Sequence, residues 1–445
     1  MIILEKILFY LLIFCLPFQT RKILYQWGDG FNEWTSAYLY LTDLLILLIF
    51  LVWAWRKRKE RFFKRGLAIG RFQEIMKSPS FWLAAFLIVS LISLVQARNI
   101  QLGFYAWFKL LEFAGLFFYL KYNFRQLFNF ERVAQVFLAS GLFQSFIAFG
   151  QYTSQKSLGL RYLFESPLGP ETAGVAKIVV EGTKMIRPYG SLPHPNLLAV
   201  FLLLSIFCFC FLWLNKKHSF IKNCFLLIVF CLLIFTLGLT FSRLIIFTFL
   251  LASLIYFVFT FWRVIQTSDK ELFKRIISIF LLFIVFCSLF TALAWPEISS
   301  RWPISLTEQS VGLRTFYNQT AFSMIKEHPW LGIGLGNFVW EIREMFHLLS
   351  AWLHQPVHNV YLLIVNEVGL ISLVVFLLFL WKLLKKINQK EQFLLLLVFS
   401  FLFIALFDHF FWTLQQGQLM FWLILGIIGA NCPHSLTDRA YPSGG

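Results

Sequence analysis

Residues 225–261 read FLLIVFCLLIFTLGLTFSRLIIFTFLLASLIYFVFTF, and Arg243 is the only charged residue among these 37. A membrane helix needs about 20 apolar residues to cross a hydrocarbon core of about 30 Å. The run is therefore too long for a single membrane helix. It predicts a hairpin of two membrane helices with Arg243 near the turn.

The rest of the chain is as apolar as this segment. Of 445 residues, 59% are hydrophobic and only 14% are charged, whereas an ordinary soluble domain has about 25% charged residues. This composition excludes a soluble enzyme and indicates a polytopic membrane protein. The net charge of +17 does not indicate a nucleic-acid partner, because the basic residues lie mainly between apolar runs and are not interleaved with aromatic residues on one face.

Apolar runs of about 20 residues recur along the sequence and predict an all-α integral membrane protein with about twelve transmembrane helices. The first run carries Glu5 and Lys6 and lacks a cleavage site of small residues, so we interpret it as a retained span and not as a signal peptide. The predicted spans lie near residues 4–18, 37–55, 80–97, 102–120, 132–150, 194–214, 222–241, 243–262, 275–295, 357–381, 392–412 and 415–430.

The predicted loops divide the chain into four parts. Residues 1–295 hold the first nine spans and an outer loop at 151–193. Residues 296–356 form a large outer, periplasmic loop domain between spans nine and ten. This loop is too aromatic for disorder and has helical spacing up to His328-Pro329, so we expect it to be partly helical. Residues 357–430 hold spans ten to twelve, and 431–445 form a polar cytoplasmic tail.

The distribution of basic residues predicts the orientation in the membrane. Cytoplasmic loops carry an excess of Lys and Arg. With the N-terminus inside, 25 of the 39 basic residues fall on the cytoplasmic side. Both termini are therefore predicted to be cytoplasmic, and the long loops are predicted to lie outside.

Three arginines and one histidine are predicted on the outer side, and they suit a diphosphate substrate. Arg243 near membrane depth needs a partner or a function, although a snorkelling residue at a hairpin tip is the simpler alternative. Arg187 lies in the first outer loop, where a solvated arginine is equally ordinary, and Arg314 lies at the start of the helix predicted in the large outer loop. A guanidinium binds phosphate oxygens with two parallel hydrogen bonds. His358, at the start of the tenth span, is a candidate general base, or else a structural histidine.

Other candidates have both a structural and a functional interpretation. The glycines of Gly332-Ile-Gly334-Leu-Gly336 form either a tight turn with close helix packing or a backbone-amide cradle for phosphate. Lys109 and Glu112, three residues apart, form either an intrahelical ion pair or a proton relay. No metal-binding motif, acidic pair or serine nucleophile elbow is found in the outer loops, so neither a metal nor another cofactor is predicted.

Four sequence elements follow one another between residues 187 and 369. They are Arg-x-x-Gly-x-x-x-x-Pro-Asn at Arg187 to Asn196, Ser242-Arg243, Arg314 followed by His328-Pro-x-x-Gly-x-Gly-x-Gly-Asn-Phe, and His358-Asn-x-Tyr-Leu with Glu367-x-Gly369. Together they resemble the O-antigen ligase and O-antigen polymerase superfamily of bacterial membrane glycosyltransferases. The sequence departs from the family pattern where Ser191-Leu-Pro-His194 replaces the commoner Phe-x-Asn.

The resemblance implies a glycan donor carried on undecaprenyl diphosphate, used outside the cytoplasmic (inner) membrane without a metal or a nucleotide sugar. It implies that His358 is the base that deprotonates the acceptor hydroxyl. The donor-binding residues would be Arg187, Arg243, Arg314, Gly334, Gly336 and Asn359, and His354 and Asp408 would lie on the acceptor side.

Four functions remain open at this point. A ligase transfers the glycan to lipid A-core oligosaccharide, which is the favoured interpretation, and a polymerase transfers it to another lipid-linked glycan. A protein O-oligosaccharyltransferase would glycosylate a protein hydroxyl. A twelve-helix secondary transporter is the alternative from another class, but such transporters have two related halves, and the halves of this sequence look unrelated.

Overall fold

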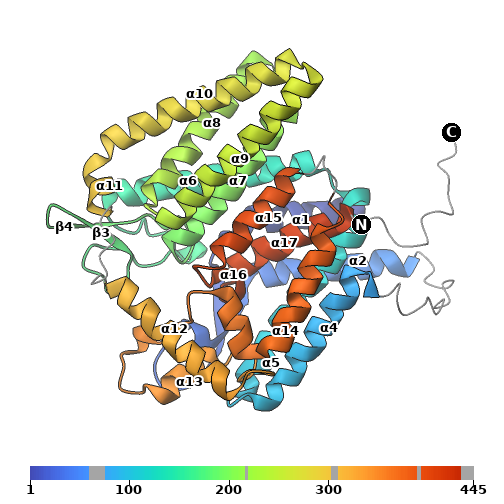
Figure 1. The fold of residues 1–445 in the computed structure, drawn as a ribbon, viewed down its shortest axis with the longest axis vertical. Coiled ribbons are helices and arrows are strands. Elements are labelled where there is room, and N and C mark those ends of the chain that lie inside the picture. The colour runs from blue at the N-terminus through green and yellow to red at the C-terminus, as the bar shows by residue number, and fades with distance from the viewer. Residues whose placement is uncertain (60–75, 216–218, 302–308, 388–391, 432–445) are drawn as a thin grey trace.

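The computed structural model describes residues 1–59, 76–215, 219–301, 309–387 and 392–431, and these are mostly helical (Figure 1). Cys432 and nearly all of the predicted tail lie outside the described residues. Within them, seven helices are long and apolar enough to cross a membrane. These are Pro79–Gln96, Phe130–Ser154, Pro195–Leu214, Ile221–Leu239, Arg243–Thr267, Lys270–Leu293 and Val360–Leu384. The all-α membrane character predicted from the sequence agrees with this architecture.

A helix occupies each of the twelve predicted ranges, but five of these helices fall short of the length or apolarity that marks a span, so the number twelve stays a prediction. The eleventh predicted span reaches residue 412, whereas its helix ends at Ile404. The twelve helices are α1 (Ile2–Cys15), α2 (Leu41–Lys59), α4 (Pro79–Ile92), α5 (Ile100–Leu127), α6 (Phe130–Ser154), α7 (Pro195–Asn215), α8 (Phe220–Leu239), α9 (Arg243–Thr267), α10 (Lys270–Leu293), α14 (Val360–Leu384), α15 (Gln392–Ile404) and α17 (Gln415–Asn431).

The hairpin predicted from residues 225–261 is confirmed. Helix α8 ends at Leu239, and α9 begins at Arg243. Phe241, between them, has a φ of 46°, a left-handed conformation that reverses the chain. The lone charge of the long apolar run thus stands at the turn.

Two β-hairpins were not predicted from the sequence. Strand β1 (Arg21–Gln26) pairs with β2 (Ser36–Tyr40), and β3 (Lys177–Val180) pairs with β4 (Thr183–Ile186), both antiparallel. Strand β2 was not predicted because its apolar residues continue directly into the apolar run of α2. The two-residue turn of Glu181 and Gly182, both at positive φ, has the twist that favours a tight hairpin.

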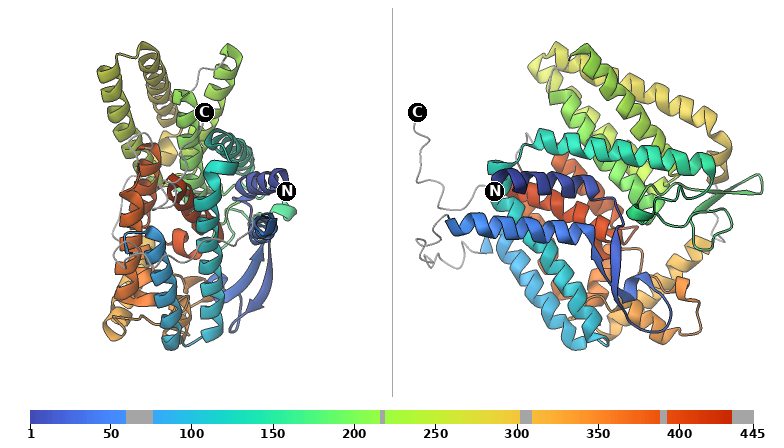
Figure 2. Two further views of the ribbon diagram at one scale, coloured as in Figure 1. Left: turned by 90° about the vertical axis from the view of Figure 1, so that its right-hand side faces the viewer. Right: turned by 180° about the vertical axis from the view of Figure 1, so that it is seen from behind.

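The helices pack so that the elements predicted to lie outside gather on one side of the molecule. Helix α17 packs against α5, α14 against α4, α6 against α7, and α15 against α9. Figures 1 and 2 show that the N-terminus lies on the side of the molecule away from α12 (Gln309–Glu327), α13 (Phe338–Met345) and both hairpins. Helix α12 ends one residue before His328-Pro329, as its sequence predicted.

A break in α14 receives the glycine-rich loop. Gly369 has a φ of 82°, and the helix there leaves backbone groups free for the loop: Ile333 N–H donates to Asn366 O at 2.8 Å, and Leu370 N–H donates to Pro329 O at 2.9 Å. A Cβ on Gly334 would collide with Ala97, which precedes α5. The loop therefore needs glycines in order to pack closely against its neighbouring helices.

Candidate functional site

The site is built around the turn between α8 and α9. Arg187 is buried, with 6% of its surface exposed. Its Nε donates to Thr240 O at 2.6 Å, and its Nη2 donates to Asn196 Oδ1 at 2.8 Å. The Ser242 hydroxyl donates to the same amide oxygen at 2.9 Å. Arg187 and Asn196 therefore fix the turn from which Arg243 begins α9.

Asn196 also connects this turn to the segment after α15. Its Nδ2 donates to Asp408 Oδ2 at 3.1 Å, and His409 N–H donates to Asp408 Oδ1 at 2.8 Å. Burial raises the pKa of Asp408, but the neighbouring histidines His409, His358 and His194 and the hydrogen bond from Asn196 outweigh burial, so the pKa is lowered overall. Asp408 is therefore an ionised carboxylate at neutral pH.

Three imidazoles surround this carboxylate. The rings of His358 and His409 meet edge-on with centroids 4.9 Å apart, and Tyr317 stacks on His358 at 6.1 Å. Burial, with Arg187 as the next cause, lowers the pKa of His194 to about 3, and burial and His358 lower the pKa of His409 to about 3. All three imidazoles therefore favour the uncharged form at neutral pH.

Two charged neighbours shift the pKa of His358 in opposite directions. Burial lowers it, Asp408 raises it, and Arg314 lowers it, with a net decrease below the usual value. An uncharged imidazole can accept a proton, and the nearby carboxylate favours the imidazolium that forms. The geometry therefore suits His358 as a general base.

The predicted arginines reach this cluster from different elements. Arg314 is an exposed residue of α12, and its positive charge lowers the pKa of His194, His358 and His409. Arg243 is half-buried at the start of α9, directly after Ser242. The structure thus brings Arg187, Arg314 and His358 to one place and sets Arg243 beside it.

Two predicted residues have evident structural partners. Asn359 caps α14, since its Oδ1 accepts from Leu362 N–H at 2.9 Å and its Nδ2 donates to Leu406 O at 3.0 Å. The buried His354 has its Nε2 3.0 Å from Phe346 O. These contacts are sufficient to explain both residues, and their roles toward donor and acceptor stay predictions.

Backbone N–H groups of the glycine-rich loop donate hydrogen bonds to a carboxylate of the protein itself. The carboxylate of Glu367 accepts hydrogen bonds from the backbone N–H groups of Gly336 and Phe338 and from Trp412 Nε1, the last at 2.8 Å. This favours the packing interpretation of Gly334 and Gly336 over an amide cradle for phosphate. Their part in donor binding stays a prediction.

Sequence reasoning missed several residues of the site. His194 and Asn196 were noted only as parts of a proline-rich turn, and His409 only as the neighbour of Asp408. Thr413, whose hydroxyl lies 2.7 Å from His409 Nδ1, was not singled out. The available signals were a histidine between two prolines, followed by an asparagine, at a helix start, and an Asp-His pair within an apolar segment.

The ion pair predicted within α5 is confirmed and belongs to a larger network. Lys109 Nζ lies 2.8 Å from Glu112 Oε2 and 2.6 Å from Asp43 Oδ1. Gln415 Nε2 donates to the same Asp43 and to Thr42 Oγ1. The network joins α2, α5 and α17.

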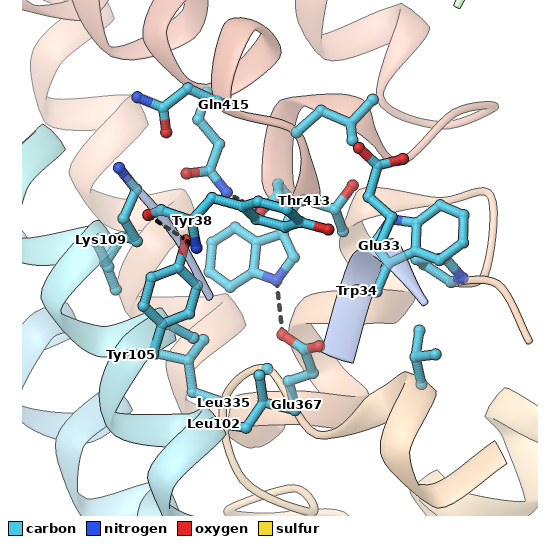
Figure 3. A pocket seen from close by; sticks show the side chains of 18 of the residues that line it. Glu33, Trp34, Tyr38, Leu102, Tyr105, Lys109, Leu335, Glu367, Thr413 and Gln415 are labelled. Atoms are coloured by element: carbon cyan, nitrogen blue, oxygen red, sulfur yellow. Dashed lines mark hydrogen bonds between the residues drawn. The ribbon is translucent and has the colours of Figure 1, made fainter. Parts of the chain in front are cut away.

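A cavity lies beside the histidines (Figure 3). Trp34 at its wall meets His409 edge-on, with ring centroids 5.9 Å apart. The polar and aromatic residues lining it include Glu33, Trp34, Ser36, Tyr38, Tyr40, Tyr105, Lys109, Glu367, Trp412, Thr413, Gln415 and Gln418.

Part of the chain matches a known protein family. Residues 227–377 match the family model described as O-antigen ligase. This segment runs from within α8 into α14 and contains Arg243, Arg314 and His358. No curated protein matches the chain.

Proposed function

Because the domain at residues 227–377 makes the chain a member of the O-antigen ligase superfamily, we propose that it is a ligase-type glycosyltransferase. It transfers a glycan from undecaprenyl diphosphate to a hydroxyl of lipid A-core oligosaccharide. The reaction takes place on the periplasmic side of the bacterial inner membrane. Both termini are cytoplasmic in this proposal, in keeping with the bias of basic residues.

One observation carries the proposal: His358 and Asp408 lie together among groups that come from separate parts of the chain. The charge of Arg314 acts on His358, and Arg187 holds the turn at which Arg243 begins α9. His358 takes the proton of the acceptor hydroxyl, and the acceptor oxygen bonds to the anomeric carbon of the donor. The bond from that carbon to the diphosphate oxygen breaks at the same time. The lipid diphosphate leaves as an anion.

Arg314 and Arg243 stabilise the charge that develops on the leaving diphosphate. Fixed cations at the place where charge develops are among the larger catalytic terms. Arg187 positions the turn that carries Arg243, through its hydrogen bonds to Thr240 and Asn196. Because these side chains supply the positive charge, the proposed reaction requires no metal ion. The polyprenyl tail of the donor would lie among membrane lipids and apolar helices.

A reconstituted transfer assay tests this function. Purified protein receives undecaprenyl diphosphate with a labelled glycan, with and without lipid A-core, in the presence of a chelator. Label on the core sugar, lost in His358→Ala, supports a ligase. A ladder of lengthening glycan on the lipid carrier would instead establish a polymerase, and label on a protein hydroxyl would establish a protein glycosyltransferase. No transfer by the unaltered protein under any condition would contradict all three.

A further inference from the structure

The cavity beside His409 has the composition of a binding site, and the mechanism above does not use it. It lies between the β1–β2 hairpin, α5 and the C-terminal helices, and Figure 3 shows aromatic rings, carboxylates and an amide around one space. Arg187, Arg243 and Arg314 are not among its lining residues. The cavity is therefore distinct from the region that would bind the diphosphate.

Three buried polar atoms on residues that line the cavity have no hydrogen-bond partner within the described part of the chain. They are the donor Nε1 of Trp34, the hydroxyl of Tyr38 and the acceptor Oε1 of Gln415. The Gln415 side chain is held in place, because its Nε2 donates to Thr42 and Asp43. Buried polar groups are normally paired. A donor and an acceptor left open in one wall match a ligand with hydroxyl groups, since a hydroxyl both accepts and donates.

The charged side chains of the cavity wall already have partners within the protein. Lys109 contacts Asp43 and Glu112, and Glu33 contacts Arg21 at 2.7 Å. The carboxylate of Glu367 receives the indole N–H of Trp412, marked by the dashed line to its carboxylate in Figure 3. No cation in this wall is left for a phosphate or carboxylate of a ligand. An uncharged ligand is favoured.

The cavity wall also contains aromatic side chains. Trp34, Tyr38, Tyr105 and Trp412 all line the cavity and offer apolar ring surface next to the open polar atoms. A pyranose ring has apolar C–H faces and a polar rim of hydroxyls, so rings and hydrogen-bonding groups together suit it. Trp34 and Thr413 both contact His409, which places the cavity directly beside the imidazole cluster.

We propose that this cavity binds an uncharged sugar ring of the acceptor glycan and holds its hydroxyl toward His358. The assignment to the acceptor rests on the proposed function, whereas the binding of a neutral sugar does not. A donor glycan is also made of sugars. The experiment therefore tests first whether the cavity binds a neutral sugar, and then whether that sugar belongs to the acceptor or to the donor.

The first part measures binding without any reaction. Saturation-transfer NMR is applied to the full-length protein in lipid nanodiscs, which avoids sugar-headed detergents. The probes are methyl glucoside, methyl galactoside and N-acetylglucosamine, beside glucose 6-phosphate and glucuronate. We expect at least one neutral probe to bind and both anionic probes to bind at least tenfold more weakly. Equal or tighter binding of the anionic probes, or no binding of any neutral probe, overturns the proposal.

Variants of Trp34 connect binding to the cavity. Trp34→Ala should weaken neutral-sugar binding at least tenfold, and Trp34→Phe, which keeps a ring but loses the N–H, should have an intermediate effect. Trp352→Phe is the matched control, because this outer tryptophan is 52% exposed and does not line the cavity. Unchanged binding in Trp34→Ala, with a thermal unfolding transition like that of the unaltered protein, overturns the assignment to this cavity. If Trp34→Ala does not fold, unchanged binding in Trp34→Phe overturns the assignment to this cavity.

The second part uses the transfer assay. Trp34→Ala should raise the KM for the acceptor at least tenfold, Trp34→Phe should raise it by a smaller factor, and both should leave the KM for the donor unchanged. A raised donor KM with an unchanged acceptor KM assigns the cavity to the donor glycan and overturns the acceptor role. If the unaltered protein binds neutral sugars here but transfers nothing, the proposed function fails while the neutral-sugar site stands.

Discussion

Asn196 Nδ2 donates to Asp408 Oδ2 across 3.1 Å, although the two residues are 212 positions apart in the chain. Its amide oxygen accepts from both Arg187 and Ser242. One asparagine thus joins the turn before Arg243 to the carboxylate beside the histidines. The leaving-group side and the base side of the proposed reaction meet at this side chain.

Asn196→Ala should lower transfer at least tenfold and destabilise the fold by about 1–3 kcal/mol, because it leaves buried partners without their hydrogen bonds. Transfer kinetics and thermal unfolding measure the two effects. Gln355→Ala, which removes only a local hydrogen bond to Trp352 O on the same side of the molecule, is the control and should change neither. Transfer at the unaltered rate by Asn196→Ala would show that the connection is dispensable.

The pH dependence of transfer should respond in opposite directions to two substitutions. The base must be neutral to act, so transfer falls as the pH drops through the lowered pKa of His358, below about 6.5. Asp408 raises this pKa, so Asp408→Asn should move the acidic limb of kcat/KM to lower pH. Arg314 lowers it, so Arg314→Gln should move the limb to higher pH. Shifts in the same direction, or none, would argue that another group is the base.

The hairpin at residues 225–261 and helix α12 were predictable because each depends on a local pattern: an apolar run too long for one span, and helical spacing ended by a proline. The hydrogen bond between Asn196 and Asp408 was not predictable, because no local pattern in either segment specifies a partner over 200 residues away. The sequence predicted that Arg187 binds phosphate, whereas its burial and its hydrogen bonds to Thr240 and Asn196 emerge only from the fold.

Acid should destabilise the protein through His194 and His409. Their pKa values in the folded protein are about 3, whereas an unfolded histidine has a pKa of about 6.5. Between these values the unfolded chain binds more protons, so the stability that these histidines contribute is present above about pH 6.5 and is lost as the pH falls toward about 3. Thermal unfolding from pH 7.5 to 4.5 should show a falling transition temperature.

The variants His194→Gln and His409→Gln test that assignment. Each should make the transition temperature less dependent on pH over the same interval, because glutamine does not titrate. His347→Gln is the control, since this exposed histidine has no described contact with the cluster and should leave the slope unchanged. A slope that both cluster variants retain would assign the acid sensitivity to other groups.

Gly369→Ala should destabilise the fold strongly. Its φ of 82° is unfavourable for alanine, and the added Cβ would collide with the backbone carbonyl of Trp330. The backbone strain alone is worth about 1–3 kcal/mol, and the collision adds to it. Gly312→Ala is the matched control, because a Cβ there meets open space and alanine favours a helix. Thermal unfolding should separate the two, and equal transition temperatures would contradict the packing of the loop into the break of α14.

Glu367→Gln tests what the glycine-rich loop binds. The carboxylate accepts three N–H groups, from Gly336, Phe338 and Trp412, and an amide nitrogen in place of one oxygen would face donors. We expect destabilisation of about 1–3 kcal/mol, with the donor KM unchanged within about twofold because the loop amides serve Glu367 and not the diphosphate. Glu171→Gln, at an exposed carboxylate paired with Lys184, should leave both quantities unchanged. A large change in donor KM without a loss of stability would restore the amide cradle for phosphate as the function of Gly334 and Gly336.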